Sequence, residues 1–149
     1  MKIASEKDLA QNLIEQNSLC VLATASKSGT PEAATIEYAE DEENNFYFTT
    51  KSTSRKYKNI RENPLGCIVI TKAPYTLQIE GILKELSESE VGFAIEKLTK
   101  KLGQPREIYA KSEWVFMKFI PKEINIASYP KWPSRFEKPD STLWNEESH

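Results

Sequence analysis

The chain has 149 residues, of which 39% are hydrophobic, and its formal net charge is -2. This length favours one compact domain, and the near balance of charges excludes a general attraction to nucleic acid or to membranes. The only histidine is His149, the last residue, so we expect neither a metal site nor a catalytic site that needs a fixed imidazole.

The first half of the chain predicts a helix followed by three strands. Ser5 is a suitable N-cap, and apolar residues follow it at helical spacing. Two apolar or β-branched runs and one aromatic run then come next, separated by turn residues. The three expected strands are residues 19–25, 31–38 and 46–50, with an acidic turn at 41–45.

The second half predicts two helices and three more strands. Ser54 caps a short helix, and a capping box at residues 87–90 begins a longer helix that ends at Gly103. The expected helices are residues 55–62 and 88–102, and the expected strands are residues 66–71, 75–86 and 114–126. Pro121 lies inside the last strand and predicts a break or a bulge there.

The order of these elements predicts a mainly β fold with flanking helices, in which a mainly antiparallel sheet closes on itself. Residues 1–128 make up this domain. Residues 129–149 contain three prolines and are expected to form an extended tail, which belongs to the same domain or to a dimer interface.

Residues 46–63 are the segment that could carry chemistry. A strand ends there in hydroxyl residues and gives way to a helix that begins with Arg55 and Lys56. Free main-chain N–H groups, the positive end of the helix dipole, hydroxyl groups and these cations suit one phosphate group. The alternative is a solvated helix face with Ser54 as an ordinary N-cap.

Four stretches occur in an order that is typical of one family. They read LATASKSGTPEAATIEY, FYFTT, SRKYKNIRENP and LQIEGILKEL, and they lie within residues 19–86. In this order they resemble the pyridoxamine 5'-phosphate oxidase-like family of FMN-binding split barrels, and the third stretch is the most specific. The resemblance implies a six-stranded antiparallel split β-barrel that works as a homodimer, with FMN at the subunit interface.

The resemblance also implies which residues bind the cofactor. They lie at the start of the 55–62 helix and on the second, third and fifth strands. The implied residues are Ser54, Arg55 and Lys56 for the phosphate, Thr49 and Thr50 flanking the flavin, main-chain groups of Thr35, Ile36 and Glu37 beside the isoalloxazine ring, and Thr76 or Gln78 as a hydrogen-bonding residue. Polar faces on half-exposed strands also explain the residues of the second and fifth strands.

Two departures from the oxidase argue against vitamin B6 oxidation itself. The oxidase has a basic residue at the start of its second strand, where this chain has Ala33-Ala34-Thr35. The oxidase also has a basic, histidine-containing motif near its C-terminus, which this tail does not reproduce. Two roles fit Trp132 of the tail: covering an edge of the flavin across the dimer, or packing the tail onto the barrel.

We therefore expect an FMN-dependent oxidoreductase in which N5 of the flavin accepts a hydride from a small organic donor or from NAD(P)H. The alternatives are a non-enzymatic flavin-binding or electron-carrier module, and the same fold binding F420 or haem.

The expected location is the cytoplasm. The first ten residues are too polar for a secretory signal, and the sequence has no transmembrane stretch. Cys20 and Cys67 lie in apolar runs and are typical of small buried side chains in a reducing compartment.

Overall fold

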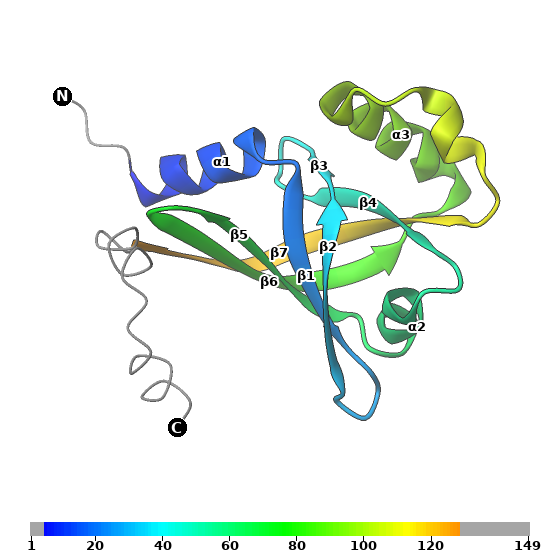
Figure 1. The fold of residues 1–149 in the computed structure, drawn as a ribbon, viewed down its shortest axis with the longest axis horizontal. Coiled ribbons are helices and arrows are strands. Elements are labelled where there is room, and N and C mark those ends of the chain that lie inside the picture. Colours follow the sequence, from blue (N-terminus) through cyan, green and yellow to red (C-terminus); the bar gives the residue numbers. More distant parts are fainter. Residues whose placement is uncertain (1–4, 129–149) are drawn as a thin grey trace, which may run out of the picture.

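The computed structural model describes residues 5–128, which form one antiparallel sheet with helices at its rim (Figure 1). The elements in chain order are α1 (Glu6–Gln16), β1 (Leu19–Ala25), β2 (Pro31–Glu37), β3 (Ala39–Glu40), β4 (Phe46–Lys51), α2 (Arg55–Glu62), β5 (Leu65–Lys72), β6 (Tyr75–Glu85), α3 (Glu88–Leu102), a 3-10 helix η1 (Arg106–Ala110) and β7 (Trp114–Ser128).

The strands follow the order β2-β1-β5-β6-β7-β4-β3, and every neighbouring pair is antiparallel. The sheet curls on itself as a split barrel, which confirms the predicted fold class (Figure 1). The six expected strands are all present. The described residues contain a seventh, β3, which the sequence analysis missed because it is only two residues long.

β3 exists because the acidic turn at 41–45 folds the chain back onto β4. The Asp41 carboxylate accepts hydrogen bonds from the main-chain N–H groups of Glu43, at 2.9 Å, and Asn45, at 3.0 Å. This closes the turn and pairs Ala39 with Tyr47.

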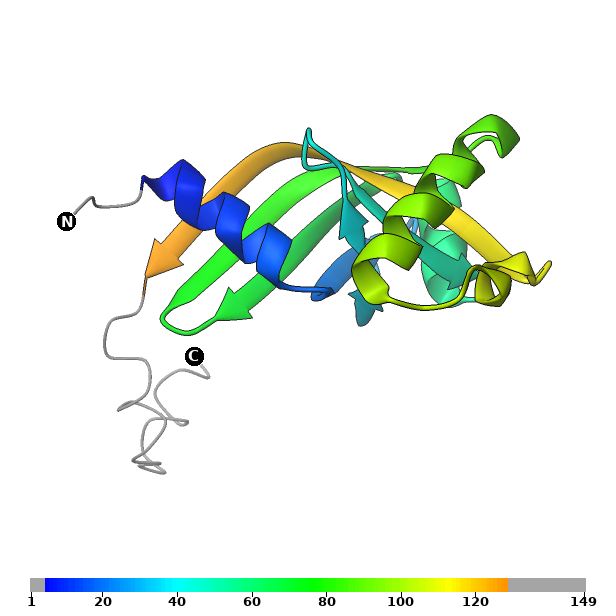
Figure 2. The same cartoon turned by 90° about the horizontal axis from the view of Figure 1, so that it is seen from above.

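The expected irregularity at Pro121 is a β-bulge in β7. Glu80 of β6 pairs with Glu123 of β7, but the next residue, Gly81, pairs with Pro121, so Lys122 is the extra residue. Proline has no N–H to donate to a neighbouring strand, and a bulge accommodates this lack. Figure 2 shows β7 curving as it crosses the sheet.

The hydrophobic core has two parts. Inside the barrel, side chains from six strands pack together, and Ile14 of α1 closes one end. A smaller cluster lies beneath α3, where Leu98 packs against Tyr47 and Phe116. The Tyr38 hydroxyl joins barrel and helix by donating to the main-chain oxygen of Ile14 at 2.7 Å.

The two cysteines differ in their surroundings. Cys20 is buried in the barrel, and this burial raises the pKa of its thiol to about 12, as expected for a small apolar side chain. Cys67 is only half-buried, because its side chain lies on the outer face of β5 rather than in the core. Within residues 5–128, no helix has the length and apolar character needed to cross a membrane.

Candidate functional site

A hollow of about 710 Å³ lies along α2, from the segment that follows β4 to the last turn of the helix. It is lined by hydroxyl groups, by one aromatic ring, and by three cations against a single carboxylate. The lining residues are Ser52, Thr53, Ser54, Arg55, Tyr57, Lys58, Arg61 and Glu62. The hollow therefore has a positive character suited to an anion.

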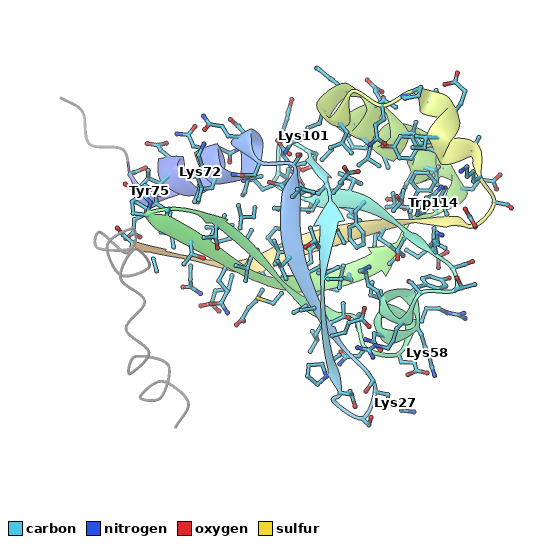
Figure 3. The ribbon with its side chains drawn as sticks, in the orientation of Figure 1. Lys27, Lys58, Lys72, Tyr75, Lys101 and Trp114 are labelled. Carbon is cyan, nitrogen blue, oxygen red and sulfur yellow. The ribbon has the colours of Figure 1, made fainter. Side chains whose placement is uncertain are left out.

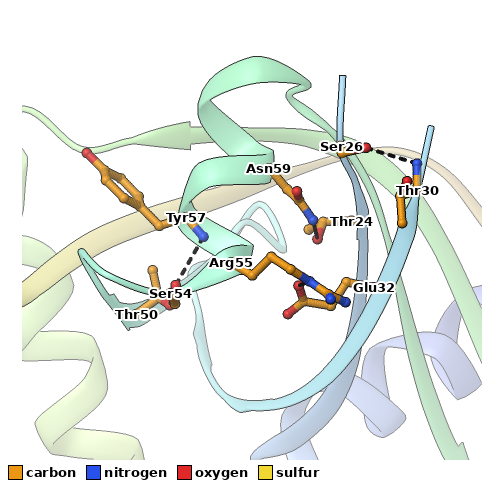
Figure 4. A network of polar contacts seen from close by, with 9 residues as sticks. All are labelled: Thr24, Ser26, Thr30, Glu32, Thr50, Ser54, Arg55, Tyr57 and Asn59. Carbon is orange, nitrogen blue, oxygen red and sulfur yellow. Dashed lines mark hydrogen bonds and ion pairs between the residues drawn. The ribbon is translucent and has the colours of Figure 1, made fainter. Parts of the chain in front are cut away.

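Ser54 organises the entrance to the helix, as predicted. Its hydroxyl accepts a hydrogen bond from the main-chain N–H of Tyr57 at 3.1 Å, which makes it the N-cap of α2. The buried Thr50 hydroxyl lies 2.9 Å from the same oxygen (Figure 4). Helix geometry leaves the N–H groups of Arg55 and Lys56 without an intrahelical partner, so two donors remain for a ligand.

Tyr57 forms a fixed wall of the hollow. Its hydroxyl donates to a carboxylate oxygen of Glu85 in β6 at 2.9 Å, and this hydrogen bond raises the pKa of Tyr57 above its usual value. The guanidinium of Arg61 lies 5.6 Å from the centre of the Tyr57 ring, within range of a cation–π contact. Both contacts stabilise the ring in this position.

Not every predicted cation faces the hollow. Arg55 does, and its Nε donates to Glu32 of β2 at 2.5 Å (Figure 4). Lys56 is half-buried and is not among the lining residues, whereas Lys58 and Arg61 are. The spacing of three between Arg55, Lys58 and Arg61 places them on one helix face, and that spacing was the signal that could have identified them.

β2 carries the residues expected beside a flavin ring. Thr35 and Glu37 are exposed, whereas the Ile36 side chain is buried in the barrel core, so only main-chain groups of Ile36 are available to a ligand. β2 is the terminal strand of the sheet and pairs only with β1. One edge of its main chain is therefore open to form hydrogen bonds.

The structure does not bring Thr76 or Gln78 to this site within one chain. Both lie near the start of β6, where the Thr76 hydroxyl is 3.1 Å from the Thr71 hydroxyl. Tyr75, the first residue of β6, and Lys58 of α2 lie at opposite ends of the molecule (Figure 3). Thr49 lies half-buried on β4 before Thr50, and Trp132 lies outside the described residues.

A second, mainly apolar hollow of about 670 Å³ lies on the outer face of the sheet, between the ends of β1, β5 and β6. Ala23 and Cys67, which pair across β1 and β5, both line it. Along the same face, large apolar side chains are exposed: Leu19 by 55%, Val21 by 40% and Leu65 by 62%. Across residues 5–128, no three side chains of His, Cys, Asp or Glu lie together as metal ligands would.

Fold and site together define a small split-barrel protein with a cationic hollow at a helix N-terminus. Residues 7–125 match the model of the family described as pyridoxamine 5'-phosphate oxidase, and the chain belongs to this family. A pyridoxine/pyridoxamine 5'-phosphate oxidase from Alkalilimnicola ehrlichii is 34% identical over 96 residues, which are 63% of this chain and 46% of the relative. The chain thus spans less than half the length of that relative.

Solved structures with the same fold differ in what their names say they bind. HutZ, the heme storage protein from Vibrio cholerae, aligns with a TM-score of 0.72 and 13% identity, over 85% of this chain and 95% of HutZ. An F420 reductase aligns with a TM-score of 0.65 and 23% identity, over 77% of this chain and 94% of that one. At these identities the likeness establishes the fold alone.

Proposed function

We propose that the protein binds FMN at the interface of a homodimer and acts as an FMN-dependent oxidoreductase. The observation that carries this proposal is the cationic hollow at the start of α2, in a chain that belongs to the pyridoxamine 5'-phosphate oxidase family. A phosphate group is the chemical feature that distinguishes FMN from riboflavin, and the hollow has the donors such a group needs.

The residues of the hollow fit a phosphate group. Arg55 and Lys58 supply charge, and the Thr53 hydroxyl can donate a hydrogen bond. The main-chain N–H groups of Arg55 and Lys56, in the first turn, have no acceptor within the helix. Ser54 holds the first turn in place through its bond to Tyr57. These groups would bind and orient the phosphate.

The isoalloxazine ring needs main-chain hydrogen bonds and apolar surface. The open edge of β2 around Thr35, Ile36 and Glu37 supplies the main-chain hydrogen bonds. A second copy of the chain would cover the exposed apolar side chains of β1 and β5 and so exclude water from this apolar surface. A partner subunit could also supply Thr76 or Gln78, neither of which lines the α2 hollow within one chain.

Bound FMN would supply the redox chemistry, since N5 of the flavin accepts a hydride from a small organic donor or NAD(P)H. The protein would bind the phosphate, orient the ring and keep water out. Vitamin B6 oxidation is not proposed, because Ala33-Ala34-Thr35 contains no basic residue where the oxidase has one. A cytoplasmic location is proposed from the two free cysteines.

The test is the visible absorption spectrum of purified protein, recorded before and after incubation with FMN and removal of the unbound fraction. We expect stoichiometric flavin. Rapid reduction by NAD(P)H or an organic donor would support an enzyme, and reduction only by a protein partner would support an electron carrier. A Soret band would indicate that the cofactor is haem. Binding of F420 with no uptake of FMN would indicate that the cofactor is the deazaflavin.

Arg55→Ala tests the phosphate contact. We expect it to weaken FMN binding by about tenfold, because one charge-assisted hydrogen bond is lost at a partly exposed side chain. Binding is measured by fluorescence quenching of the flavin. Lys100→Ala, at an exposed lysine of α3, removes the same kind of charge from another surface and should leave affinity unchanged. Equal affinities of both variants would move the phosphate site away from α2.

A further inference from the structure

Arg55 is the cation nearest the helix end, and it is already paired. Its Nε donates to Oε2 of Glu32 at 2.5 Å, which joins the first residue of α2 to β2 (Figure 4). The two side chains are unequally exposed, Arg55 by 66% and Glu32 by 17%. The carboxylate is therefore the more fixed partner.

The position of Glu32 is set by the packing of α2 against the β1–β2 hairpin. Glu32 pairs with Thr24 across the two strands, so their side chains lie on the same face of the sheet. The buried Thr24 hydroxyl accepts a hydrogen bond from the amide of the buried Asn59 of α2 at 3.2 Å. This contact holds the helix against the strand and places the Glu32 carboxylate beside Arg55.

The turn between the two strands also holds Glu32 in place. The main-chain N–H of Ser26 donates to the oxygen of Thr30 at 2.9 Å, and the Thr30 N–H donates to the Ser26 hydroxyl at 2.9 Å (Figure 4). These bonds close the hairpin two residues before Glu32. The main chain of Glu32, the second residue of β2, is therefore held by the closed hairpin, and its carboxylate lies beside Arg55 at the start of α2.

We infer that Glu32 sets the strength and selectivity of phosphate binding at the α2 site, by offsetting the charge of Arg55. A guanidinium has five N–H donors, and Glu32 engages the one on Nε, so Arg55 can still contact a phosphate. The pairing nevertheless occupies one guanidinium donor and neutralises much of the charge that Arg55 would present to a phosphate, which leaves Lys58 and Arg61 as the cations of the hollow without a carboxylate partner among the described residues. This inference rests on the proposed function.

Comparing FMN with riboflavin isolates the effect of Glu32 on phosphate binding, because riboflavin lacks the phosphate. We expect Glu32→Gln to tighten FMN binding by about fivefold at low salt and to leave riboflavin binding unchanged. Both affinities are measured by flavin fluorescence with the full chain. A general structural role of Glu32 would change both affinities together. Glu96→Gln, an exposed carboxylate of α3, removes the same charge from another surface and is the matched control.

A double-mutant cycle tests whether Glu32 acts on FMN binding through Arg55. In the Arg55→Ala background, Glu32→Gln should change FMN affinity much less than in the wild type, because the two side chains act as a pair. Unchanged or weaker FMN binding by Glu32→Gln would overturn the inference while leaving the proposed function in place. If neither the wild type nor Glu32→Gln binds either flavin, the proposed function fails and this inference fails with it.

Discussion

At the scale of single residues, Gly81 is the position where the barrel tolerates no side chain. A Cβ there would lie 2.6 Å from Cζ of Phe119 and would overlap the main-chain oxygen of Ile120, both in β7. Neither neighbour can move easily, because Phe119 is fully buried and Ile120 precedes the bulge. We expect Gly81→Ala to lower the free energy of unfolding by about 1–3 kcal/mol, measured by urea denaturation.

Gly92 provides the matched control. It lies within α3, and a Cβ there would meet no atom within 4 Å. Gly92→Ala should therefore raise the free energy of unfolding by about 0.5–1 kcal/mol, since alanine loses less conformational entropy in a helix. If both variants shifted stability in the same direction, the close approach of β6 to β7 would not be the cause.

At the scale of elements, α2 depends on its N-cap. Ser54→Ala removes the acceptor for the Tyr57 N–H and the partner of the buried Thr50 hydroxyl. We expect a loss of about 1 kcal/mol in the free energy of unfolding, measured by thermal or urea denaturation. Because the first turn also forms the hollow, FMN binding should weaken in the same variant.

Ser52→Ala is the control that separates loss of the N-cap from loss of a serine hydroxyl in the same hollow. Ser52 lines the same hollow, but its main-chain N–H donates to the main-chain oxygen of Glu113, and this hydrogen bond survives the change. The free energy of unfolding of Ser52→Ala should stay within about 0.5 kcal/mol of the wild-type value, as for other surface substitutions. An equal loss in both variants would mean that Ser54 has no special role in starting α2.

At the scale of the whole molecule, the outer face of β1 and β5 should be covered by a second copy. Leu65, exposed by 62%, lies on this face with Leu19 and Val21. We expect Leu65→Lys to shift the protein from dimer to monomer, because a buried unpaired charge is strongly unfavourable in an apolar interface. The measurement is size-exclusion chromatography with light scattering.

Ile108→Lys is the control for this change. Ile108 is an exposed apolar residue of η1. The η1 segment, drawn in yellow, follows α3 and lies away from β5 (Figure 1). The Ile108→Lys substitution should leave the oligomeric state unchanged. A monomeric wild-type protein, or a Leu65→Lys variant that remains a dimer, would contradict the proposed interface.

The sequence by itself determined the element types, because their signals are local. Capping residues such as Ser54 and Ser87, the helical spacing behind them and the apolar runs of the strands depend only on near neighbours. Pro121 likewise indicated the bulge, since its missing N–H is a property of the residue alone. The family was indicated separately, by the resemblance of four stretches of the sequence to known members.

Only the tertiary structure decided which side chains meet. The Arg55–Glu32 pair joins residues 23 positions apart, and the hydrogen bond of Tyr57 to Glu85 spans 28 positions, so no local pattern announces either contact. Folding also separated Lys56 from the hollow and Thr76 from α2, although the sequence grouped them with one site. The physical reason is that long-range contacts depend on how the sheet curls and where each helix packs, and these are properties of the whole chain.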